Sequence, residues 1–154
     1  MSRAFVKEDD SGGIEPLPDR AISPHPNFVT PQGLAAIEQN LAELAQRHAA
    51  AVKAEDRAAQ GAIARDLRYW NTRRASAQTV KAPDAPSEVG FGTTVTIERE
   101  DGRRQTWQIV GEDEADPAQG TLSYVSPVAR VLMGKRVGNV VRAGNSDAEI
   151  VLIS

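Results

Sequence analysis

The stretch Ile109–Asn139, IVGEDEADPAQGTLSYVSPVARVLMGKRVGN, decides the fold of this chain. It predicts a strand, an acidic turn, a second strand and a short helix in succession. The acidic run that follows Gly111 ends in a proline and cannot continue a buried strand. Ser126-Pro127 then supplies a helix N-cap and a proline at the first helical position, where its missing N–H costs nothing. Gly134 ends that helix.

The rest of the C-terminal half has the alternation of a β-sheet. Its β-branched runs predict strands, and Asp101-Gly102 supplies the positive φ angles of a tight hairpin between two of them. In chain order the predicted strands are 93–97, 106–110, 121–125, 139–142 and 149–153, the last two around a turn at Gly144-Asn145. These strands and the helix predict a curled antiparallel sheet with the helix across one face, where Val128 and Leu132 point inward.

The N-terminal half has helical periodicity instead. Thr30-Pro31 opens a first helix with an N-cap and a proline. Apolar positions then recur at spacings of three and four residues on two consecutive segments: Leu34, Ile37, Leu41 and Leu44, then Ile63, Leu67 and Trp70. Neither segment is apolar enough to be stable alone. We therefore expect an antiparallel two-helix coiled-coil hairpin with its turn near residues 53–58.

The predicted organisation is α+β, in four segments. Residues 1–29 are rich in proline and acidic residues and predict an extended or disordered leader. Residues 30–82 form the helical hairpin, 83–88 a proline-containing linker, and 89–154 the β-rich domain. The alternative for the leader is a docking segment that becomes ordered on a partner, with Phe5 or Phe28 as its anchor.

Composition and charge narrow the classes of protein. The chain has 154 residues and no cysteine, which excludes disulfides and thiolate metal sites and favours a reducing cytoplasm. No apolar run approaches the ~20 residues of a membrane span, and the N-terminus lacks a signal peptide. Residues 30–83 carry eight Lys/Arg and five Asp/Glu, whereas residues 84–154 carry seven and eleven. A basic arm on an acidic domain lacks the dense basic face of a duplex-DNA binder.

Three ordered blocks carry a resemblance to a known family. They are Val110-Gly111-x-Asp113-Glu114-Ala115-Asp116, Ser126-Pro127-Val128-Ala129-Arg130 and Leu132-Met133-Gly134-Lys135. In this order they resemble the C-terminal domain of the bacterial transcript-cleavage factors GreA and GreB, over roughly Val89–Ile153. The resemblance implies an FKBP-like fold for this domain. The alternative is that the blocks specify only a small β-domain.

The resemblance also implies a role for the hairpin tip. Gre factors insert their hairpin into the secondary channel of RNA polymerase, where acidic tip residues help to hold a catalytic Mg²⁺ that the polymerase supplies. Here Glu55 and Asp56 are the only acidic residues near the turn. The alternative is that Asp56 caps the second helix, with Glu55 beside its positive end. The hairpin is also shorter than the Gre pattern by about six residues per helix, or ~9 Å of reach.

The same family docks its C-terminal domain on the rim of that channel. The resemblance makes Ser126, Pro127, Asp113, Glu114 and Asp116 the polymerase-binding candidates. The alternatives are that Ser126 is only a helix cap and that the acidic run is a solvated turn.

Basic side chains of the arm could face acidic channel walls or RNA phosphates, or could be ordinary exposed helix residues. They are Arg57, Arg65, Arg68, Arg73 and Arg74.

Catalytic chemistry has little support of its own. The two histidines, His25 and His48, have no nucleophile beside them, and no phosphate-cradling glycine motif is present. We therefore expect a monomeric, cytoplasmic accessory factor without a cofactor of its own, which binds RNA polymerase and could contact the RNA 3′ end. It either stimulates cleavage of backtracked RNA or, like the shorter-armed Rnk-type relatives, modulates or competes with true Gre factors. The alternatives are a coiled-coil adaptor or chaperone and, with less support, an FKBP-type prolyl isomerase.

Overall fold

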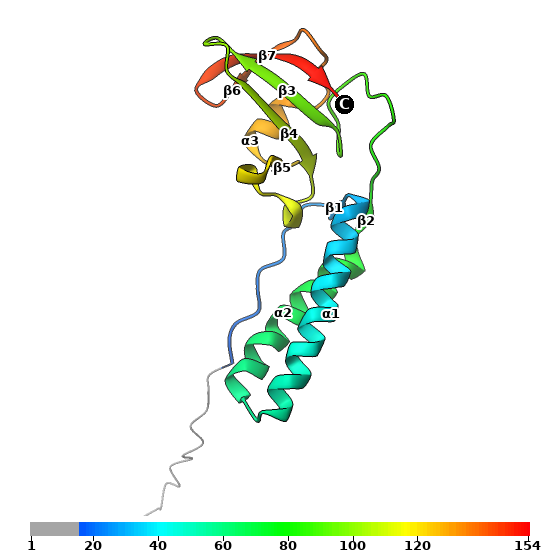
Figure 1. The fold of residues 1–154 in the computed structure, drawn as a ribbon, viewed down its shortest axis with the longest axis vertical. Coiled ribbons are helices and arrows are strands. Elements are labelled where there is room, and N and C mark those ends of the chain that lie inside the picture. The colour runs from blue at the N-terminus through cyan, green and yellow to red at the C-terminus, as the bar shows by residue number, and fades with distance from the viewer. Residues whose placement is uncertain (1–15) are drawn as a thin grey trace, which may run out of the picture.

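The computed structural model describes residues 16–154 and consists of a long helical arm below a small β-domain (Figure 1). In the arm, α1 (Pro31–Lys53) and α2 (Arg57–Ser76) lie antiparallel and are joined by a tight turn. At 1.5 Å per residue, α1 alone is about 35 Å long. The predicted hairpin and the position of its turn are both confirmed, and the fold is α+β as expected.

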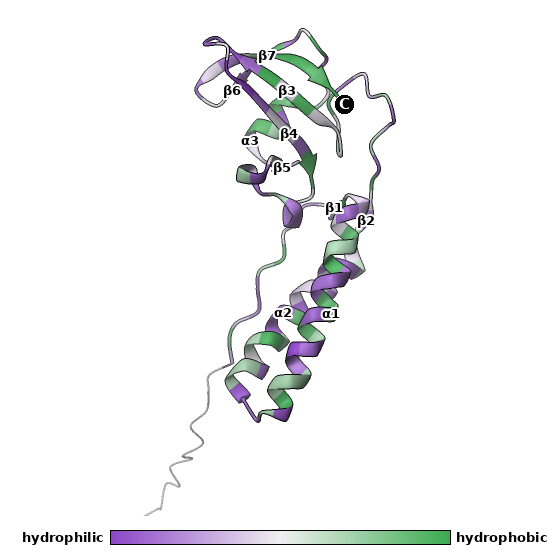
Figure 2. Cartoon of the chain, in the orientation of Figure 1, coloured by the Kyte–Doolittle hydropathy of each residue, from purple (hydrophilic) through white to green (hydrophobic). Residues whose placement is uncertain are grey.

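The apolar stripes of the two helices face each other along the arm (Figure 2). Ile37, Leu44 and Ala51 of α1 are buried, and so is Ile63 of α2. At the start of α1 the Thr30 hydroxyl accepts a hydrogen bond from the Gly33 N–H at 3.0 Å, as an N-cap does. Because the arm buries few large side chains, it depends on its attachment at the root for a fixed position.

The root of the arm is closed by a short parallel sheet. In it, β1 (Phe28–Val29) pairs with β2 (Gln78–Thr79). Val29 is 1% exposed and Asn27 is 4% exposed, so the last residues of the predicted leader are packed rather than free. Residues 16–26 run beside α2 as an extended segment (Figure 1). Phe5, one of the two anchors considered for the leader, lies outside the described residues.

The β-domain contains a five-stranded sheet in the order β5-β4-β3-β7-β6. Its strands are β3 (Thr94–Arg99), β4 (Arg104–Val110), β5 (Thr121–Ser123), β6 (Val140–Ala143) and β7 (Ser146–Ile153). The pairing is antiparallel except between β4 and β5, which run parallel. The sheet is therefore mixed rather than wholly antiparallel, because the chain crosses back through two short 3-10 turns, η1 (Glu112–Glu114) and η2 (Pro117–Gln119), before β5 begins.

One face of this sheet is covered by α3 (Pro127–Leu132). Ala129 and Leu132 are fully buried against Ile97, Ile109 and Ile150 of the sheet. The prediction that Leu132 points inward is confirmed, and Val128 is partly buried at the margin of the same core. Within residues 16–154, no helix has the length and apolarity needed to span a membrane.

Candidate functional site

The tip of the arm presents two adjacent carboxylates. Glu55 and Asp56 are both exposed in the turn between α1 and α2, at the end of the arm farthest from the β-domain. Asp56 is the N-cap of α2, and its Oδ1 accepts a hydrogen bond from the Ala59 N–H at 3.0 Å. Glu55 has a φ of +55°, a conformation that few non-glycine residues adopt. The capping role considered for Asp56 is confirmed, and Glu55 precedes it in the same exposed turn.

The donor set at the tip fits only part of a metal site. Carboxylate oxygens are ligands that Mg²⁺ accepts, but an ion of this kind needs about six oxygen ligands. In the part of the chain that the structure describes, no group of three or more His, Cys, Asp or Glu residues could hold a metal ion. Glu55 and Asp56 could therefore complete the coordination of an ion held mainly by another molecule.

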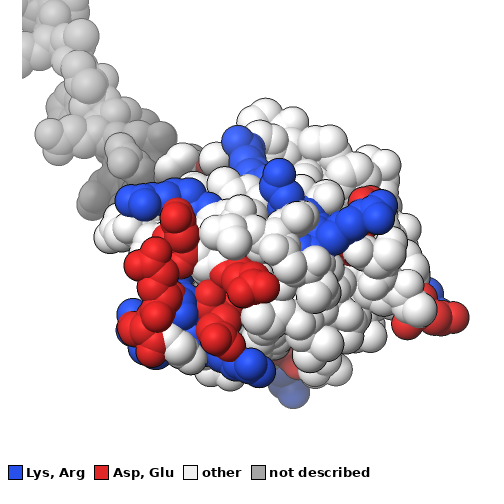
Figure 3. All heavy atoms as spheres, turned by 90° about the horizontal axis from the view of Figure 1, so that it is seen from above, with Lys and Arg blue, Asp and Glu red and all other residues white. Residues whose placement is uncertain are grey.

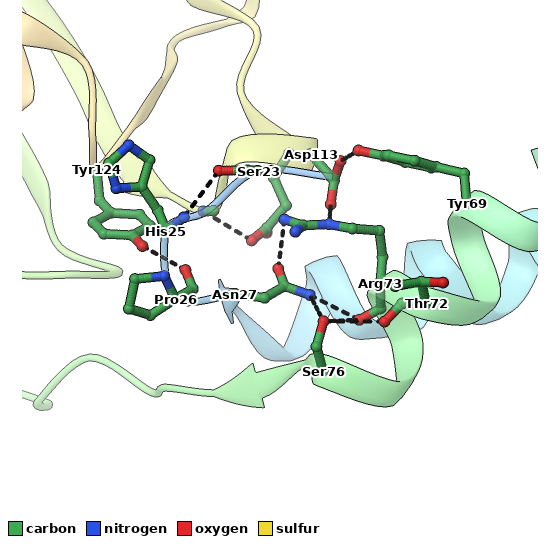
Figure 4. Close-up of polar contacts among 12 residues, drawn as sticks. Ser23, His25, Pro26, Asn27, Tyr69, Thr72, Arg73, Ser76, Asp113 and Tyr124 are labelled. Atoms are coloured by element: carbon green, nitrogen blue, oxygen red, sulfur yellow. Dashed lines mark hydrogen bonds and ion pairs between the residues drawn. The ribbon is translucent and has the colours of Figure 1, made fainter. Parts of the chain in front are cut away.

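A second cluster lies where the arm meets the β-domain, around the turn η1 (Figure 4). The Nε of Arg73 in α2 lies 2.5 Å from Oδ2 of Asp113, and the Tyr69 hydroxyl donates to the other oxygen of that carboxylate. Arg73 also donates to Oδ1 of Asn27 at 2.7 Å, while the Asn27 amide donates to the Arg73 carbonyl at 2.7 Å. The Arg73 side chain is 2% exposed and that of Asp113 is 10% exposed.

The next residue of η1 holds the other helix. Glu114 accepts hydrogen bonds from the Thr30 N–H, at 3.0 Å, and from the Thr30 hydroxyl. Its carboxylate also accepts from the Gly111 N–H at 3.1 Å, which closes the turn on itself. The positive N-terminal end of α1 stabilises a negatively charged carboxylate at this position. We call Arg73, Asp113, Glu114 and Thr30, together with Asn27, the elbow.

Aromatic packing completes the junction. The ring of Phe28 lies 5.4 Å from that of Tyr124 and 6.0 Å from that of Phe91, centroid to centroid. The Tyr124 hydroxyl donates to the Pro26 carbonyl. Of the two anchors proposed for the leader, Phe28 therefore binds the chain's own β-domain.

The hydroxyl groups at this junction are harder to ionise than usual. Burial, together with the Asp113 carboxylate, raises the pKa of Tyr69 to about 12. Burial and the nearby Glu112 carboxylate also raise the pKa of Tyr124. Both tyrosines therefore remain hydrogen-bond donors well above neutral pH.

The five polymerase-binding candidates are not all on one accessible surface. Asp116 and Pro127 are exposed, and Ser126 is half-buried because its hydroxyl caps α3 by accepting from the Ala129 N–H at 3.3 Å. Asp113 and Glu114 belong to the elbow instead. The interpretation of the whole acidic run as a solvated turn is therefore wrong for these two residues.

Arg73 differs most from its prediction. The sequence predicts that it faces a partner or water like the other basic residues of the arm, yet it is buried. Its spacing contained the signal, since Arg73 follows Trp70 by three residues and continues the inward stripe of Ile63 and Leu67. No local pattern predicts the contacts of Asn27 with Arg73 or of Thr30 with Glu114, because the two residues of each pair lie far apart in the chain.

The other basic residues of the arm are partly neutralised by acidic neighbours. Arg68 pairs with Asp19 at 2.7 Å, and Arg74 lies 3.6 Å from Glu38. The leader also contributes Arg20, whose guanidinium lies 3.8 Å from the centre of the Tyr69 ring. These contacts are largely exposed and contribute little to stability individually. The contacts of Asp19 and Arg20 hold the leader beside α2.

Charged residues of both signs share the end of the β-domain away from the arm (Figure 3). Acidic side chains gather in one group there, with Lys and Arg side chains around it. Several of the acidic residues on the outer sheet surface are paired, as in Arg104 with Glu98 at 2.8 Å and Arg142 with Asp147 at 3.6 Å. Local ion pairs thus neutralise part of the excess negative charge of this domain.

The molecule belongs to the class of proteins in which a two-helix coiled-coil hairpin is fixed to a small β-domain. Here the hairpin carries carboxylates at its tip and is held at its root by the elbow. Comparison with known proteins narrows this class. The family described as "Transcription elongation factor, GreA/GreB, C-term" matches residues 83–152. The transcription elongation factor GreA of Thioalkalivibrio sulfidiphilus is 37% identical over 135 residues, which cover 80% of this chain and 82% of that protein. The chain belongs to the GreA/GreB family of transcription elongation factors.

A second relative agrees with this assignment. The transcription elongation factor GreB of Neisseria meningitidis serogroup B is 35% identical over 136 residues, covering 75% of this chain and 83% of that protein. Among solved structures, the GreA factor homolog Gfh1 of Thermus thermophilus is 19% identical with a TM-score of 0.42, covering 84% of this chain and 99% of that one.

Proposed function

We propose that this protein binds RNA polymerase and regulates transcription elongation through the secondary channel, with the β-domain as the grip and the helical arm as the probe. The observation that carries the proposal is the slender helical arm itself, which is about 35 Å long and extends away from the β-domain to the exposed turn at Glu55 and Asp56. Family membership supports the same partner, since the relatives are named as transcription elongation factors. Such a factor works in the cytoplasm and needs no active site of its own.

Two mechanisms are open to such an arm. In the first, the tip carboxylates complete the coordination of a Mg²⁺ ion held by the polymerase, and backtracked RNA is cut by the polymerase itself. In the second, the arm occupies the channel without reaching the ion and so competes with longer-armed factors. We favour the second, because the sequence predicts an arm ~9 Å shorter than the Gre pattern and coordination bonds of ~2.0–2.6 Å cannot absorb that difference.

The state of the tip supports the same choice. One oxygen of Asp56 is already engaged in capping α2, so Glu55 has the more available carboxylate. A single available carboxylate is a weaker ligand set than a pair.

The grip would use the exposed residues near the start of α3. Pro127 and Asp116 are accessible, and Ser126 holds the helix start that presents Pro127. We do not assign Asp113 and Glu114 to this contact, because the elbow engages both carboxylates. Arg57 is exposed at the start of α2 and is the arm's candidate for contact with the RNA 3′ end.

Two other function classes have less support. A prolyl isomerase needs an open apolar pocket lined by aromatic side chains, but the rings of Phe91 and Tyr124 pack against Phe28. An adaptor or chaperone needs an unoccupied apolar stripe on its hairpin, but the stripes of α1 and α2 are buried against each other.

The proposal is tested with stalled, backtracked elongation complexes. We expect the protein to bind core polymerase, to leave intrinsic RNA cleavage unstimulated, and to reduce cleavage stimulated by an authentic long-armed Gre factor in a dose-dependent way. The tip variant Glu55→Ala/Asp56→Asn should compete as well as the wild type. Glu43→Ala, which removes an exposed carboxylate from the middle of α1, is the matched control.

The other outcomes are equally informative. If the wild-type protein stimulates cleavage and the tip variant does not, the metal-directed mechanism replaces competition. If Pro127→Glu binds polymerase as well as the wild type, the assigned grip is wrong. No binding of the wild type at all would contradict the proposal as a whole.

A further inference from the structure

We infer that the turn η1 is a lock that sets the direction of the arm, and that Asp113, Glu114 and Arg73 are positioning residues rather than docking residues. The mechanical part of this inference concerns the free protein. Its functional consequence rests on the proposed function, in which the arm must point from the polymerase-binding surface of the β-domain into the channel.

The inference rests on two neighbouring residues of η1 that bind different helices of the arm. Asp113 holds α2 through Arg73 and Tyr69, whereas Glu114 holds the start of α1 through Thr30. One turn of the β-domain therefore holds both helices of the arm at their root. An arm held at two points on different helices resists rotation, whereas an arm held by one contact could swing about it.

Two glycines leave the space that the contacts of η1 occupy. A Cβ atom added to Gly33 would lie 2.1 Å from Cδ of Glu114. A Cβ atom added to Gly111 would lie 2.3 Å from the carbonyl oxygen of Phe28. A side chain at Gly33 would therefore displace the Glu114 carboxylate that holds Thr30, whereas a side chain at Gly111 would collide with the backbone of β1.

Burial makes the locked position strongly preferred. Arg73 is 2% exposed, and its charge is compensated by Asp113 and by the carboxamide oxygen of Asn27. Swinging the arm away would leave a buried charge without its partner or would carry it into water together with the rest of the elbow. Such a joint has one favoured angle rather than a range of angles.

A small error at the elbow is large at the tip. For an arm about 35 Å long, a rotation of about 10° displaces Glu55 by about 6 Å. That displacement exceeds the length of any metal–ligand bond or hydrogen bond. The elbow therefore controls where the tip lies inside a partner, although it lies a whole helix length away from it.

The first test measures the angle in the free, full-length protein. Because the chain has no cysteine, the variants Glu55→Cys and Asn145→Cys introduce the only two sites for spin labels, one at the tip and one in the exposed β6–β7 turn. Double electron–electron resonance should give one narrow distance distribution. Gly33→Ala should shift or broaden it by several ångström.

Two further variants keep this test decisive. Glu114→Gln preserves shape and removes the charge that holds α1, so it should broaden the distribution even if Gly33→Ala unfolds the chain. Gly61→Ala is the matched glycine control, since a Cβ there meets nothing within 4 Å. An unchanged distribution in Glu114→Gln, or in folded Gly33→Ala, would overturn the lock.

The second test asks what the lock does on the polymerase. Under the favoured competition mechanism, the arm must enter the channel to exclude a longer-armed factor. Glu114→Gln should therefore need a several-fold higher concentration than the wild type for half-maximal inhibition of Gre-stimulated cleavage. A purely structural role would reduce thermal stability together with binding, and a docking role would raise the same concentration with no change in the spin-label distance distribution. Either result would overturn the positioning role. The distance measurement needs no polymerase, so failure of the proposed function remains distinguishable from failure of the lock.

Discussion

The Nε of Arg73 lies 2.5 Å from Oδ2 of Asp113, and this ion pair joins the last turns of the arm to the acidic turn of the β-domain. The two residues are 40 positions apart in the chain and come from different halves of the molecule. Because of this pair, an acidic turn that resembles a surface loop in the sequence is one of the points at which the arm is attached to the β-domain.

Breaking this pair from one side should be costly. Asp113→Ala leaves the Arg73 charge buried, and we expect a loss of about 3 kcal/mol in the free energy of unfolding, measured by urea denaturation. Removing both charges in Arg73→Leu/Asp113→Leu should restore part of that loss. The exposed pair of Arg104 with Glu98 is the control, and Arg104→Ala should cost less than about 1 kcal/mol. Equal losses at the two sites would show that burial does not matter here.

Alkaline pH should weaken the elbow through Tyr69. Its pKa is raised from the ordinary value of 10.0 to about 12, so the folded state retains a proton that the unfolded state releases. The stabilising contribution is therefore complete below pH 10.0 and is lost as the pH rises toward about 12. In Tyr124→Phe, the remaining tyrosine can be titrated directly by tyrosinate absorbance. An ordinary midpoint in the folded variant would contradict the hydrogen bond to Asp113.

Two glycine substitutions should have opposite signs. Gly61→Ala lies within α2 in open space and should raise the free energy of unfolding by about 1 kcal/mol. Gly33→Ala should lower it by about 1–3 kcal/mol, because the added methyl group overlaps the Glu114 carboxylate. Thermal unfolding followed by circular dichroism compares them directly. A destabilised Gly61→Ala would indicate an unrecognised contact on that face of α2.

Substitutions at the tip should distinguish the helix-capping role of Asp56 from any role of its charge. Asp56→Ala should lower the free energy of unfolding by about 1 kcal/mol through loss of the cap, whereas Asp56→Asn should be close to neutral. Glu55→Gly should be neutral or stabilising, because glycine adopts the φ of +55° more readily. If Asp56→Asn destabilises as much as Asp56→Ala, the cap contributes through charge rather than through its hydrogen bond.

The leader should contribute unequally along its length. Asn27→Ala removes two hydrogen bonds to Arg73 in a buried site and should cost about 2 kcal/mol. Arg20→Ala removes a half-exposed contact to Asp66 and Tyr69 and should cost less than about 1 kcal/mol. Denaturant unfolding of the two variants provides the comparison. A larger loss in Arg20→Ala would make the outer leader, rather than its root, the main attachment.

Local patterns predicted most of the elements correctly. The N-caps Thr30, Asp56 and Ser126 act where short-range chemistry places them, because a cap needs only a side chain and the two or three residues that follow it. The stripe of α1 predicted its buried face for the same reason. The parallel pairing of β4 with β5 was missed, because strand direction depends on where the chain returns and not on the alternation within a strand.

The sequence alone determined the hairpin, its turn, the β-domain and the family, since each follows from spacings of a few residues or from ordered blocks of motifs. Only the tertiary structure decided that Asp113 and Glu114 bind the root of the arm and that Arg73 is buried between Asp113 and Asn27. The reason is physical: a carboxylate in a turn is equally suited to water, a partner protein or an arginine. Which of these it meets depends on chain segments that lie 40 or more residues away.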